Sequence, residues 1–317
     1  EGEKNFTITK EHLAKVLEEE PKIKEQIEVF IDWDEDNFNS SMSNSDILLT
    51  YDFPTKNIKK IAPNLKWIHC TAAGVEHLYP FSWAFNQLKI TNSSGVHAKK
   101  AGEYGLMGIL MLQNHMPKII TNQKNKRFVS LFSNPLAGKN IVLVGTGSLG
   151  SSMAKLAEPL GANIIGVNKK GRSVEGCSKV ITIEKIDTVL PEADILYLAL
   201  PETQETKNLI NRKRLNLLKS SCGIINIGRQ SALDYEVLCE KLEKQEIAGA
   251  ILDVFTTEPL ETNSKLWNTP NLVITPHVSS DDNGNYVKMT LNLFIRNLKL
   301  FIENKELINQ IDKKLGY

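Results

Sequence analysis

The chain has 317 residues, of which 41% are hydrophobic and 24% charged, which is ordinary for a globular protein of about two domains. Its formal net charge of +1 provides no field that would recruit nucleic acid or anionic lipid, so we expect neither partner. The four cysteines are scattered without a CxxC pair, and no apolar run approaches the ~18 residues that cross a bilayer. The opening residues lack the apolar core of a signal peptide. We therefore predict a cytoplasmic protein without a metal site or a membrane anchor.

The first 93 residues alternate helical and strand patterns. A short apolar stretch (FTIT) comes before a helical pattern (TKEHLAKVLEEE) that stops at Pro21, and we expect the opening strand to be short or partly missing. Four apolar runs bounded by polar clusters then predict buried parallel strands at residues 27–33, 45–51, 65–71 and 88–94. Strands that alternate with helices indicate βαβ units and an open parallel sheet.

A second series of strands follows a long apolar helical pattern that starts at Ala98. Its apolar runs are NIVLVG, NIIGV, KVITI, DILYLAL, GIINIG, GAILDVF and LVITPH, and each ends in turn or polar residues. The tail, from Tyr286, returns to helical spacing and is expected to cross back to the first domain. The predicted fold is α/β, with two doubly wound parallel-sheet domains and a cleft between them. Residues 1–93 plus 285–317 form one domain, and residues 94–284 form the other.

A glycine-rich loop lies between the first strand and first helix of the second series. In the segment IVLVGTGSLG, Gly145 permits a tight turn, Gly147 lets the backbone approach a pyrophosphate, and Gly150 lets helix and strand pack closely. The N-terminus of the following helix supplies N–H groups and a positive dipole for the anion. A strand, the loop, a helix and a second strand occur at the expected spacing, so we predict a dinucleotide-binding site.

The second strand of this series ends in a basic turn, GVNKKGR. An Asp or Glu after this strand would hydrogen-bond the ribose 2′-OH of the cofactor and repel a 2′-phosphate. This chain has Asn168 there, followed by the cations Lys169, Lys170 and Arg172. Cations at this position can pair with a phosphate. The turn therefore favours NADP(H), with NAD(H) also possible, although a solvated basic turn is the simpler alternative.

Polar residues follow three later strands of the series, at the edge where open α/β sheets place ligands. They are Arg229 after GIINIG, Asp253 and then Glu258 after GAIL, and His277 after LVITP. An imidazole is a natural acid or base near neutral pH, and a carboxylate partner favours its charged form and orients it. An arginine fork fits a carboxylate through two hydrogen bonds. These residues beside a nicotinamide describe hydride transfer between a 2-keto acid and a 2-hydroxy acid.

The ordered motifs GTGSLG, LYLALPETQETKNLIN, INIGRQ, LDVFTTEPL and TPHVSS run over nearly the whole chain. With them, the chain resembles the D-isomer-specific 2-hydroxyacid dehydrogenases, and short segments such as AAGVEHL and SSGVHAKKAGEY make it most similar to the glyoxylate and hydroxypyruvate reductases. The resemblance implies a flavodoxin-like substrate (catalytic) domain and a Rossmann cofactor domain. It also implies that Arg229 binds the substrate carboxylate, that Glu258 supports the histidine, and that His277 donates a proton to the keto oxygen.

The same resemblance assigns the remaining site residues. The backbone of Ala73, Gly74 and Val75 would complete the carboxylate site. The cofactor would be lined by Gly145, Gly147, Ser148, Leu149, Gly150, Asn168, Lys169, Arg172, Leu200, Pro201, Ile227, Gly228, Arg229 and Asp253. The family also implies a homodimer, with the segment around residues 115–128 at the contact.

Two features depart from the family pattern, and two other functions stay open. Gln230 stands where a glycine commonly follows the arginine, and VSSDDNGNY after the histidine is less familiar. The fold also serves in corepressors that sense a dinucleotide, so a binding-only protein is one alternative. A phosphoglycerate-dehydrogenase-like enzyme is the other, although there is no room after Tyr317 for the C-terminal domain of its long forms.

Overall fold

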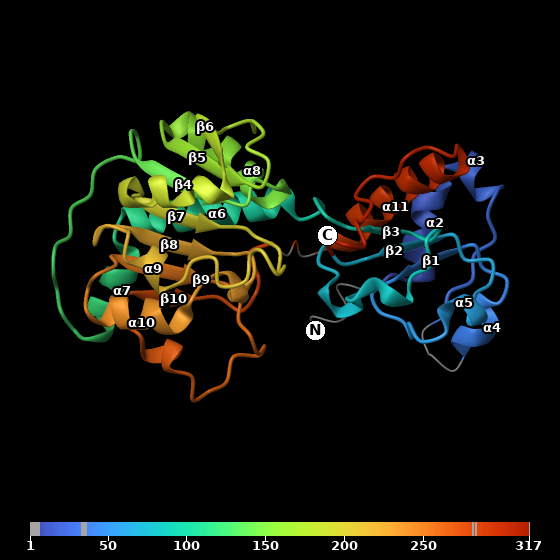
Figure 1. Cartoon of the computed structure of the whole chain (residues 1–317), viewed down its shortest axis with the longest axis horizontal. Coiled ribbons are helices and arrows are strands. Elements are labelled where there is room, and N and C mark those ends of the chain that lie inside the picture. Colours follow the sequence, from blue (N-terminus) through green and yellow to red (C-terminus); the bar gives the residue numbers. More distant parts are fainter. Residues whose placement is uncertain (1–6, 33–36, 281, 283, 317) are drawn as a thin grey trace. The chain divides into compact units, whose positions relative to one another are not determined.

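The computed structural model of the chain describes residues 7–32, 37–280, 282 and 284–316. The chain divides into two compact units. Unit 1 consists of residues 1–96 and 282–317, and unit 2 consists of residues 97–281. Figure 1 labels the helices and strands of both units.

Unit 1 contains a three-stranded parallel sheet in the order β1-β2-β3, formed by Ile47–Thr50, Trp67–Cys70 and Lys89–Asn92. Its helices are α2 (Lys10–Glu18), α3 (Pro21–Lys24), α4 (Phe38–Met42), α5 (Ile58–Ile61) and α11 (Tyr286–Ile302), with 3₁₀ turns η2 (Glu76–Leu78) and η3 (Phe81–Trp83). Helix α2 begins after Thr9, whose hydroxyl accepts the His12 N–H in a capping box. The strands predicted within residues 45–51, 65–71 and 88–94 are all present, as β1, β2 and β3.

The strand predicted at residues 27–33 is not formed between Ile27 and Asp32, and Trp33 lies outside the described residues. Residues Thr7 to Thr9 of the short opening stretch FTIT form no strand either. In the first of these segments Val29 and Phe30 are exposed, so its apolar side chains do not enter the core as those of a central strand would. A short apolar run fits a buried strand and an extended loop equally well, and the prediction failed for that reason.

The core of unit 1 joins its first helix to the tail of the chain. Leu13 and Leu17 of α2 pack in one cluster with Phe294 and Leu298 of α11, and Trp67 of β2 lies in the same cluster. The Trp67 and Phe294 rings stack at 5.1 Å between centroids. The predicted return of the last helix to the first sheet is therefore seen within this unit.

Unit 2 contains a seven-stranded sheet in which each neighbouring pair of strands is parallel. The order is β10-β9-β8-β7-β4-β5-β6, which places β4 between β5 and β7. The strands are β4 (Asn140–Val144), β5 (Asn163–Asn168), β6 (Lys179–Thr182), β7 (Ile195–Leu198), β8 (Gly223–Asn226), β9 (Gly249–Leu252) and β10 (Leu272–Ile274). All seven match the predicted runs.

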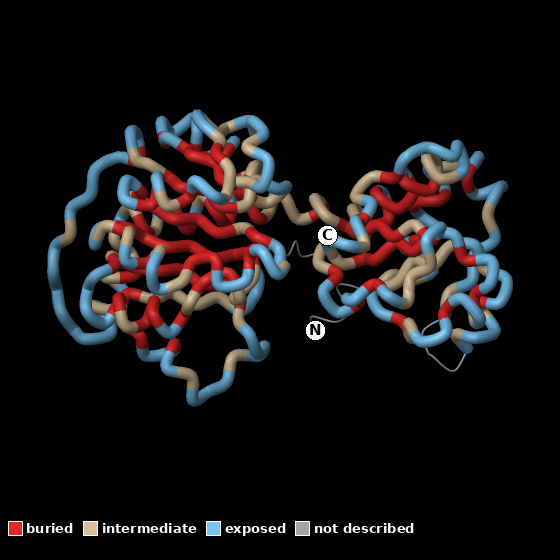
Figure 2. Tube along the Cα trace, in the orientation of Figure 1, coloured by how far each residue is buried: buried red, intermediate tan, exposed pale blue. Residues whose placement is uncertain are grey.

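Helices cover both faces of this sheet (Figure 1). They are α6 (Ala98–Gln113), α7 (Met116–Lys124), α8 (Ser148–Ala157), α9 (Arg212–Leu215) and α10 (Tyr235–Glu243), with 3₁₀ turns η4 (Glu158–Leu160), η5 (Ile183–Thr188), η6 (Leu190–Glu192), η7 (Gln230–Ala232) and η8 (Lys265–Asn268). Along β4, Ile141 and Leu143 belong to the core cluster that contains residues of α6 and α8, whereas Val142 and Val144 belong to the other cluster, which contains residues of α10. The alternation buries both sides of the strand, as Figure 2 shows for the sheet as a whole.

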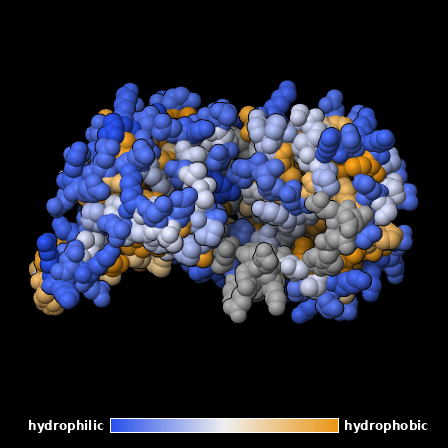
Figure 3. Space-filling view, turned by 90° about the horizontal axis from the view of Figure 1, so that it is seen from below, coloured by the Kyte–Doolittle hydropathy of each residue, from blue (hydrophilic) through white to orange (hydrophobic). Residues whose placement is uncertain are grey.

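The predicted α/β class with two parallel sheets is confirmed. Within the described ranges, no helix has both the length and the apolar character that a membrane span requires. Figure 3 shows one face of the surface, where hydrophilic side chains predominate and hydrophobic ones form small groups.

Candidate active site

The predicted site residues of unit 2 share one edge of its sheet. Gly145 follows β4, Asn168 ends β5, Arg229 follows β8, Asp253 follows β9 and His277 follows β10. Because all seven strands are parallel, these positions lie at the carboxyl edge, where such sheets bind ligands. The order of the strands thus gathers residues that are far apart in the sequence.

The glycine loop has the shape that a pyrophosphate requires. Gly145 has a φ of +95°, and a Cβ there would lie 2.4 Å from the Ala199 carbonyl oxygen. A Cβ at Gly150 would lie 2.1 Å from the Gly145 carbonyl oxygen, whereas a Cβ at Gly147 would meet no atom within 4 Å. Gly147 is the N-cap of α8, and no side chain caps that helix. Two glycines are therefore needed for packing, and the third leaves open space in front of helix N–H groups.

The residues predicted to line the cofactor offer it different groups. Ser148 and Leu149 open α8 beside the open space at Gly147. Leu200 and Ile227 are buried in the two core clusters of unit 2, so they would present main-chain atoms rather than side chains. Pro201 is exposed. A Cβ at Gly228 would lie 2.5 Å from the Leu200 nitrogen, so the ends of β7 and β8 approach closely there.

The amide of Asn168 organises the basic turn. Its Oδ1 accepts the N–H groups of Lys170 at 3.1 Å and Arg172 at 3.2 Å. Its Nδ2 donates to the Thr146 hydroxyl at 2.9 Å and to the Arg172 carbonyl at 3.0 Å. Asn168 therefore connects the glycine loop to the turn. Lys169, one of the predicted phosphate-binding cations, has its Nζ 2.7 Å from Oε1 of Glu205, an ion pair that the sequence analysis did not anticipate.

The buried side-chain amide of Asn226 holds the loop that contains Arg229. Asn226 is fully buried at the end of β8, and its Oδ1 accepts the Gly228 N–H at 3.0 Å. Its Nδ2 donates to the Arg229 carbonyl at 3.1 Å and to the Tyr235 hydroxyl at 3.1 Å. Gln230 reaches the neighbouring loop, since its Oε1 accepts the Thr256 hydroxyl at 2.8 Å. The residue that departs from the family pattern thus links the loop of Arg229 to the loop that carries Glu258.

Glu258 and His277 are in direct contact. The Nδ1 atom of His277 lies 2.7 Å from Oε2 of Glu258, whose other oxygen accepts the Phe255 N–H at 2.8 Å. The side chains of His277 and Glu258 are 43% and 34% exposed, so the pair faces solvent. With Nδ1 engaged by a carboxylate, Nε2 is the ring atom that can exchange a proton with a bound molecule.

A buried carboxylate holds the loop that carries His277. Asp253 is fully buried, and its oxygens accept the Thr275 hydroxyl at 2.5 Å and the N–H groups of Val278 at 3.0 Å and Ser279 at 2.9 Å. The Tyr104 hydroxyl of α6 lies 2.6 Å from that of Thr275. Burial raises the pKa of Tyr104 to about 12, so it remains a neutral partner. The predicted cofactor residue Asp253 is therefore a support of the His277 loop.

The backbone of His277 adopts an uncommon conformation. Its φ is +53°, in the left-handed region that non-glycine residues seldom occupy. Its N–H donates to the carbonyl oxygens of Asp253 at 2.9 Å and Thr275 at 3.1 Å. A strained backbone persists only where its surroundings hold it, and these bonds together with the Asp253 carboxylate do so.

The three predicted substrate-binding residues of unit 1 follow β2. The Ala73 carbonyl accepts Nδ2 of Asn92 at 2.6 Å, and the Val75 side chain is buried in the core of the unit. Within the described part of the chain, the N–H groups of Gly74 and Val75 donate no hydrogen bond. Gly74 and Val75 therefore have main-chain N–H donors to offer, and the role of the three residues in binding a substrate stays a prediction.

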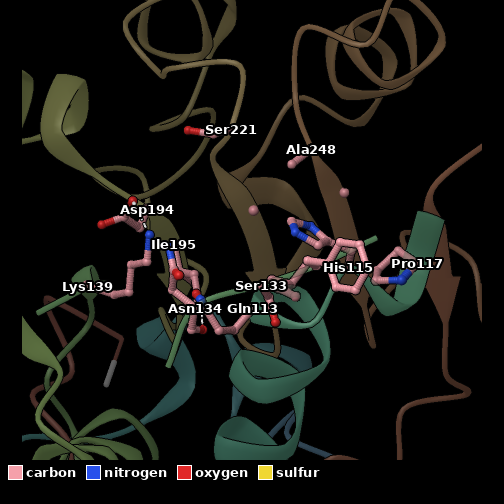
Figure 4. Close-up of a pocket in the computed structure, with 14 residues that line it drawn as sticks. Gln113, His115, Pro117, Ser133, Asn134, Lys139, Asp194, Ile195, Ser221 and Ala248 are labelled. Atoms are coloured by element: carbon pink, nitrogen blue, oxygen red, sulfur yellow. Dashed lines mark hydrogen bonds and ion pairs between the residues drawn. The ribbon is translucent and has the colours of Figure 1, made fainter. Parts of the chain in front are cut away.

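A cavity of about 230 Å³ lies at the opposite edge of the sheet in unit 2 (Figure 4). Asp194 precedes β7, and Gly223 and Gly249 open β8 and β9, so this cavity is at the amino ends of the strands. Burial would raise the pKa of Asp194, but hydrogen bonds from Lys219 and the Asn140 N–H outweigh it and lower the pKa. The cavity thus contains a structural ion pair and lies away from the site. No described group of three or more His, Cys, Asp or Glu is arranged to hold a metal ion.

Four supporting residues were missed by the sequence analysis. Thr146 and Asn226 are polar residues within or directly after buried apolar runs, and this placement could have identified them. Thr275 also stands at a strand end, two residues before the histidine. Glu205 lies in an ordinary polar loop, and nothing in the sequence around it indicates its partner.

The two units are both α/β, and the fold and strand-edge geometry define a protein with a Rossmann-type dinucleotide-binding sheet. Residues 106–279 match the family described as D-isomer specific 2-hydroxyacid dehydrogenase, NAD binding domain. A glyoxylate reductase of Thermofilum pendens is 34% identical over 226 residues, which cover 69% of this chain and 67% of that protein. A hydroxypyruvate reductase of Thermotoga maritima is 27% identical, over 71% of this chain and 74% of that protein.

Solved structures agree with these relatives. A probable 2-hydroxyacid dehydrogenase of Rhizobium etli, crystallised with NADP, HEPES and L(+)-tartaric acid, superposes with a TM-score of 0.79. It is 25% identical, and the match covers 90% of each chain. The chain belongs to the D-isomer specific 2-hydroxyacid dehydrogenase family. It is accordingly an NAD(P)-dependent 2-hydroxyacid dehydrogenase.

Proposed function

We propose that this protein reduces a small 2-keto acid of the glyoxylate or hydroxypyruvate type to the D-2-hydroxy acid, with NADPH preferred over NADH. The observation that carries the proposal is the contact of His277 with Glu258, at 2.7 Å, on the sheet edge that also carries Arg229 and the glycine loop. A proton donor, a carboxylate-binding fork and a phosphate cradle on one edge are what this reaction requires.

Each polar residue has one task in the reduction. Arg229 binds the substrate carboxylate through its planar fork, which fixes the orientation of the keto group. On the strength of family membership, main-chain donors at Gly74 and Val75 are assigned to carboxylate binding. His277 donates its Nε2 proton to the keto oxygen as negative charge develops there. Glu258 stabilises the imidazolium and orients the ring through its contact with Nδ1.

The cofactor fits the residues present. The open space at Gly147 and the uncapped start of α8 suit a pyrophosphate, and the dinucleotide, when bound, supplies the hydride. The end of β5 carries an amide and three cations instead of an acid, so the charge of this turn attracts a 2′-phosphate. Since the four cysteines are free thiols, we place the reaction in the cytoplasm.

The assay that tests this function follows loss of nicotinamide absorbance with glyoxylate and hydroxypyruvate, each with NADPH and with NADH. Turnover that favours NADPH supports the whole proposal. Turnover that favours NADH keeps the chemistry and overturns the cofactor preference. Absence of turnover with these acids, with pyruvate and with bulkier keto acids would contradict the proposed reaction and favour a dinucleotide-sensing protein of the corepressor type. Turnover restricted to phosphorylated 3-carbon acids would favour the phosphoglycerate-dehydrogenase-like alternative.

We also propose that the protein acts as a homodimer. The segment between α7 and β4 runs along the outside of unit 2, shown as the green loop in Figure 1. It carries Phe128, Val129 and Phe132 with their side chains exposed. Large aromatic groups on an extended surface segment are costly in water, and a second copy of the chain is the partner that would cover them.

A further inference from the structure

An ion pair crosses the end of the strand that carries the glycine loop. Lys169 directly follows β5, and Glu205 lies in the loop after β7. These two strands are the neighbours of β4, with Val144 in register with Val167 on one side and Leu198 on the other. The contact of Lys169 Nζ with Glu205 Oε1, at 2.7 Å, therefore spans the carboxyl end of β4.

The carboxylate of Glu205 is presented by a well-defined turn. The Thr206 hydroxyl donates to the Pro201 carbonyl at 2.7 Å and accepts the Thr203 N–H at 2.9 Å. Thr206 is buried, so this turn is anchored in unit 2. Its neighbour Glu205 is consequently carried by an ordered stretch of backbone, beside its ion-pair partner Lys169.

The ammonium of Lys169 is positioned from the other side. Asn168 closes the turn that follows through hydrogen bonds to Lys170 and Arg172, which fixes the start of the basic segment. Glu184 adds a second nearby acid. Its pKa is lowered, chiefly by a hydrogen bond from Thr182 and to a smaller extent by the charge of Lys169. Lys169 thus has the carboxylate of Glu205 in direct contact and that of Glu184 nearby.

The pair is too exposed to be needed for folding. The side chains of Lys169 and Glu205 are 44% and 58% exposed, and ion pairs of this kind contribute little to stability. Its position suits a different task, because the adenosine end of a dinucleotide occupies the crevice between the loops after the strands that flank the glycine loop. A 2′-phosphate that pairs with Lys169 must compete with Glu205 for the same ammonium.

We propose that Glu205 is a specificity-determining residue that weakens binding of the 2′-phosphorylated cofactor and so sets the ratio of NADP(H) to NAD(H) affinity. This inference rests on the proposed dinucleotide site. Glu205 acts in two ways: it occupies Lys169, and its negative charge repels the phosphate. A dinucleotide without the phosphate leaves the ion pair intact and loses nothing. The basic turn and Glu205 therefore act in opposite directions on cofactor choice.

The experiment measures binding rather than turnover. The full chain and its Glu205→Gln variant are titrated by calorimetry with NADPH, NADH, 2′,5′-ADP and AMP. We expect Glu205→Gln to tighten NADPH and 2′,5′-ADP by roughly three- to fivefold and to change NADH and AMP by less than about twofold. The gain should shrink as salt increases, since exposed charges are screened. Glu240→Gln is the matched control, because it removes a carboxylate from a similarly exposed ion pair, 2.8 Å from Arg212.

A double-mutant cycle identifies the route. Lys169→Gln should weaken the binding of NADPH and 2′,5′-ADP. In the Lys169→Gln background, Glu205→Gln should then tighten this binding by a smaller factor than it does in the wild type. Equal changes for all four ligands, or no change for the phosphorylated pair, would overturn the inference. Phosphate-selective tightening without turnover of any keto acid would support the inference while contradicting the proposed reaction. Failure of the wild type to bind any of the four ligands would overturn both.

Discussion

The imidazole of His277 and the carboxylate of Glu258 meet across 2.7 Å although they come from the ends of different strands. Glu258 is itself oriented by the Phe255 N–H, and His277 by the carbonyl of Asp253. The contact is therefore determined by backbone on both sides, and the ring is oriented before any substrate arrives. Such preorganisation is what proton transfer to a developing oxyanion requires.

Glu258→Gln keeps the shape of the partner but removes its charge. The amide cannot stabilise the imidazolium, so we expect kcat to fall by about 10- to 100-fold. His277→Ala removes the proton donor and should lower kcat by about 10²- to 10⁴-fold. Steady-state kinetics with glyoxylate check both, and the Kd of NADPH should stay within about twofold. Wild-type turnover in His277→Ala would refute the assigned role of the histidine.

Arg229→Lys tests the planar fork. Lysine retains the charge but makes a point contact with a carboxylate, so we expect the KM for the keto acid to rise by more than about tenfold. Since Arg229 Nη1 also donates to the Gly228 carbonyl at 2.9 Å, the variant should lose some order in this loop as well. The measurement is KM and kcat for glyoxylate, with the thermal midpoint as a folding control. An unchanged KM would place the substrate carboxylate elsewhere.

Thr275→Val removes the hydroxyl that lies between Tyr104 and Asp253. One buried carboxylate oxygen then loses a donor, which we expect to cost about 1–3 kcal/mol in the free energy of unfolding. Because the same carboxylate holds Val278 and Ser279, kcat should fall while the Kd of NADPH is unchanged. Thr275→Ser keeps the hydroxyl and should restore both stability and kcat. If Ser and Val behave alike, the hydroxyl is not the group that matters.

His69 makes stability depend on pH. Burial in unit 1 lowers its pKa from 6.5 to about 4, so the folded state holds it neutral while the unfolded state takes up a proton below pH 6.5. Above about pH 6.5, His69 is neutral in both states and does not affect the free energy of unfolding. As the pH falls from 6.5 toward 4, protonation of His69 in the unfolded state lowers the free energy of unfolding by up to about 3 kcal/mol. Urea unfolding at pH 7.5, 5.5 and 4.5 should show that the free energy of unfolding of the wild type falls with pH along this slope, and that the slope is smaller in His69→Gln. Identical slopes would assign it to other groups.

Phe132→Ser and Phe128→Ser test the assembly. We expect the double variant to be monomeric, because its exposed segment no longer gains from burial against a second copy. Sedimentation at several concentrations distinguishes dimer from monomer. Trp267→Ser, another exposed aromatic side chain of unit 2, is the control and should leave the mass unchanged. A monomeric wild type would contradict the proposed dimer.

The sheet of unit 2 was predictable, whereas part of unit 1 was not. Seven apolar runs bounded by turn residues form seven strands, because central strands that are buried on both faces consist almost entirely of apolar residues. Residues 27–32 carry an equally apolar run, yet Val29 and Phe30 remain exposed and no ladder forms. Local pattern cannot show whether a neighbouring strand is available to pair.

The site followed from strand ends, but its internal contacts did not. Position after a strand brought Arg229, Glu258 and His277 to one edge, since parallel strands share it. That Asp253 supports a loop depends on side-chain distances that no spacing rule contains. The same holds for Lys169, whose partner Glu205 lies 36 residues further along the chain.

Helix α11 has a consequence for the growing chain. Its Phe294 and Leu298 belong to the same core as Leu13 and Leu17, so the core of unit 1 is incomplete until α11 has been made. Unit 2 is encoded as one uninterrupted stretch and has all of its strands earlier in synthesis. On the ribosome, residues 97–281 in the middle of the sequence are thus the first to be able to fold, whereas the Trp67 ring is covered only after Phe294, more than two hundred residues later, has been translated.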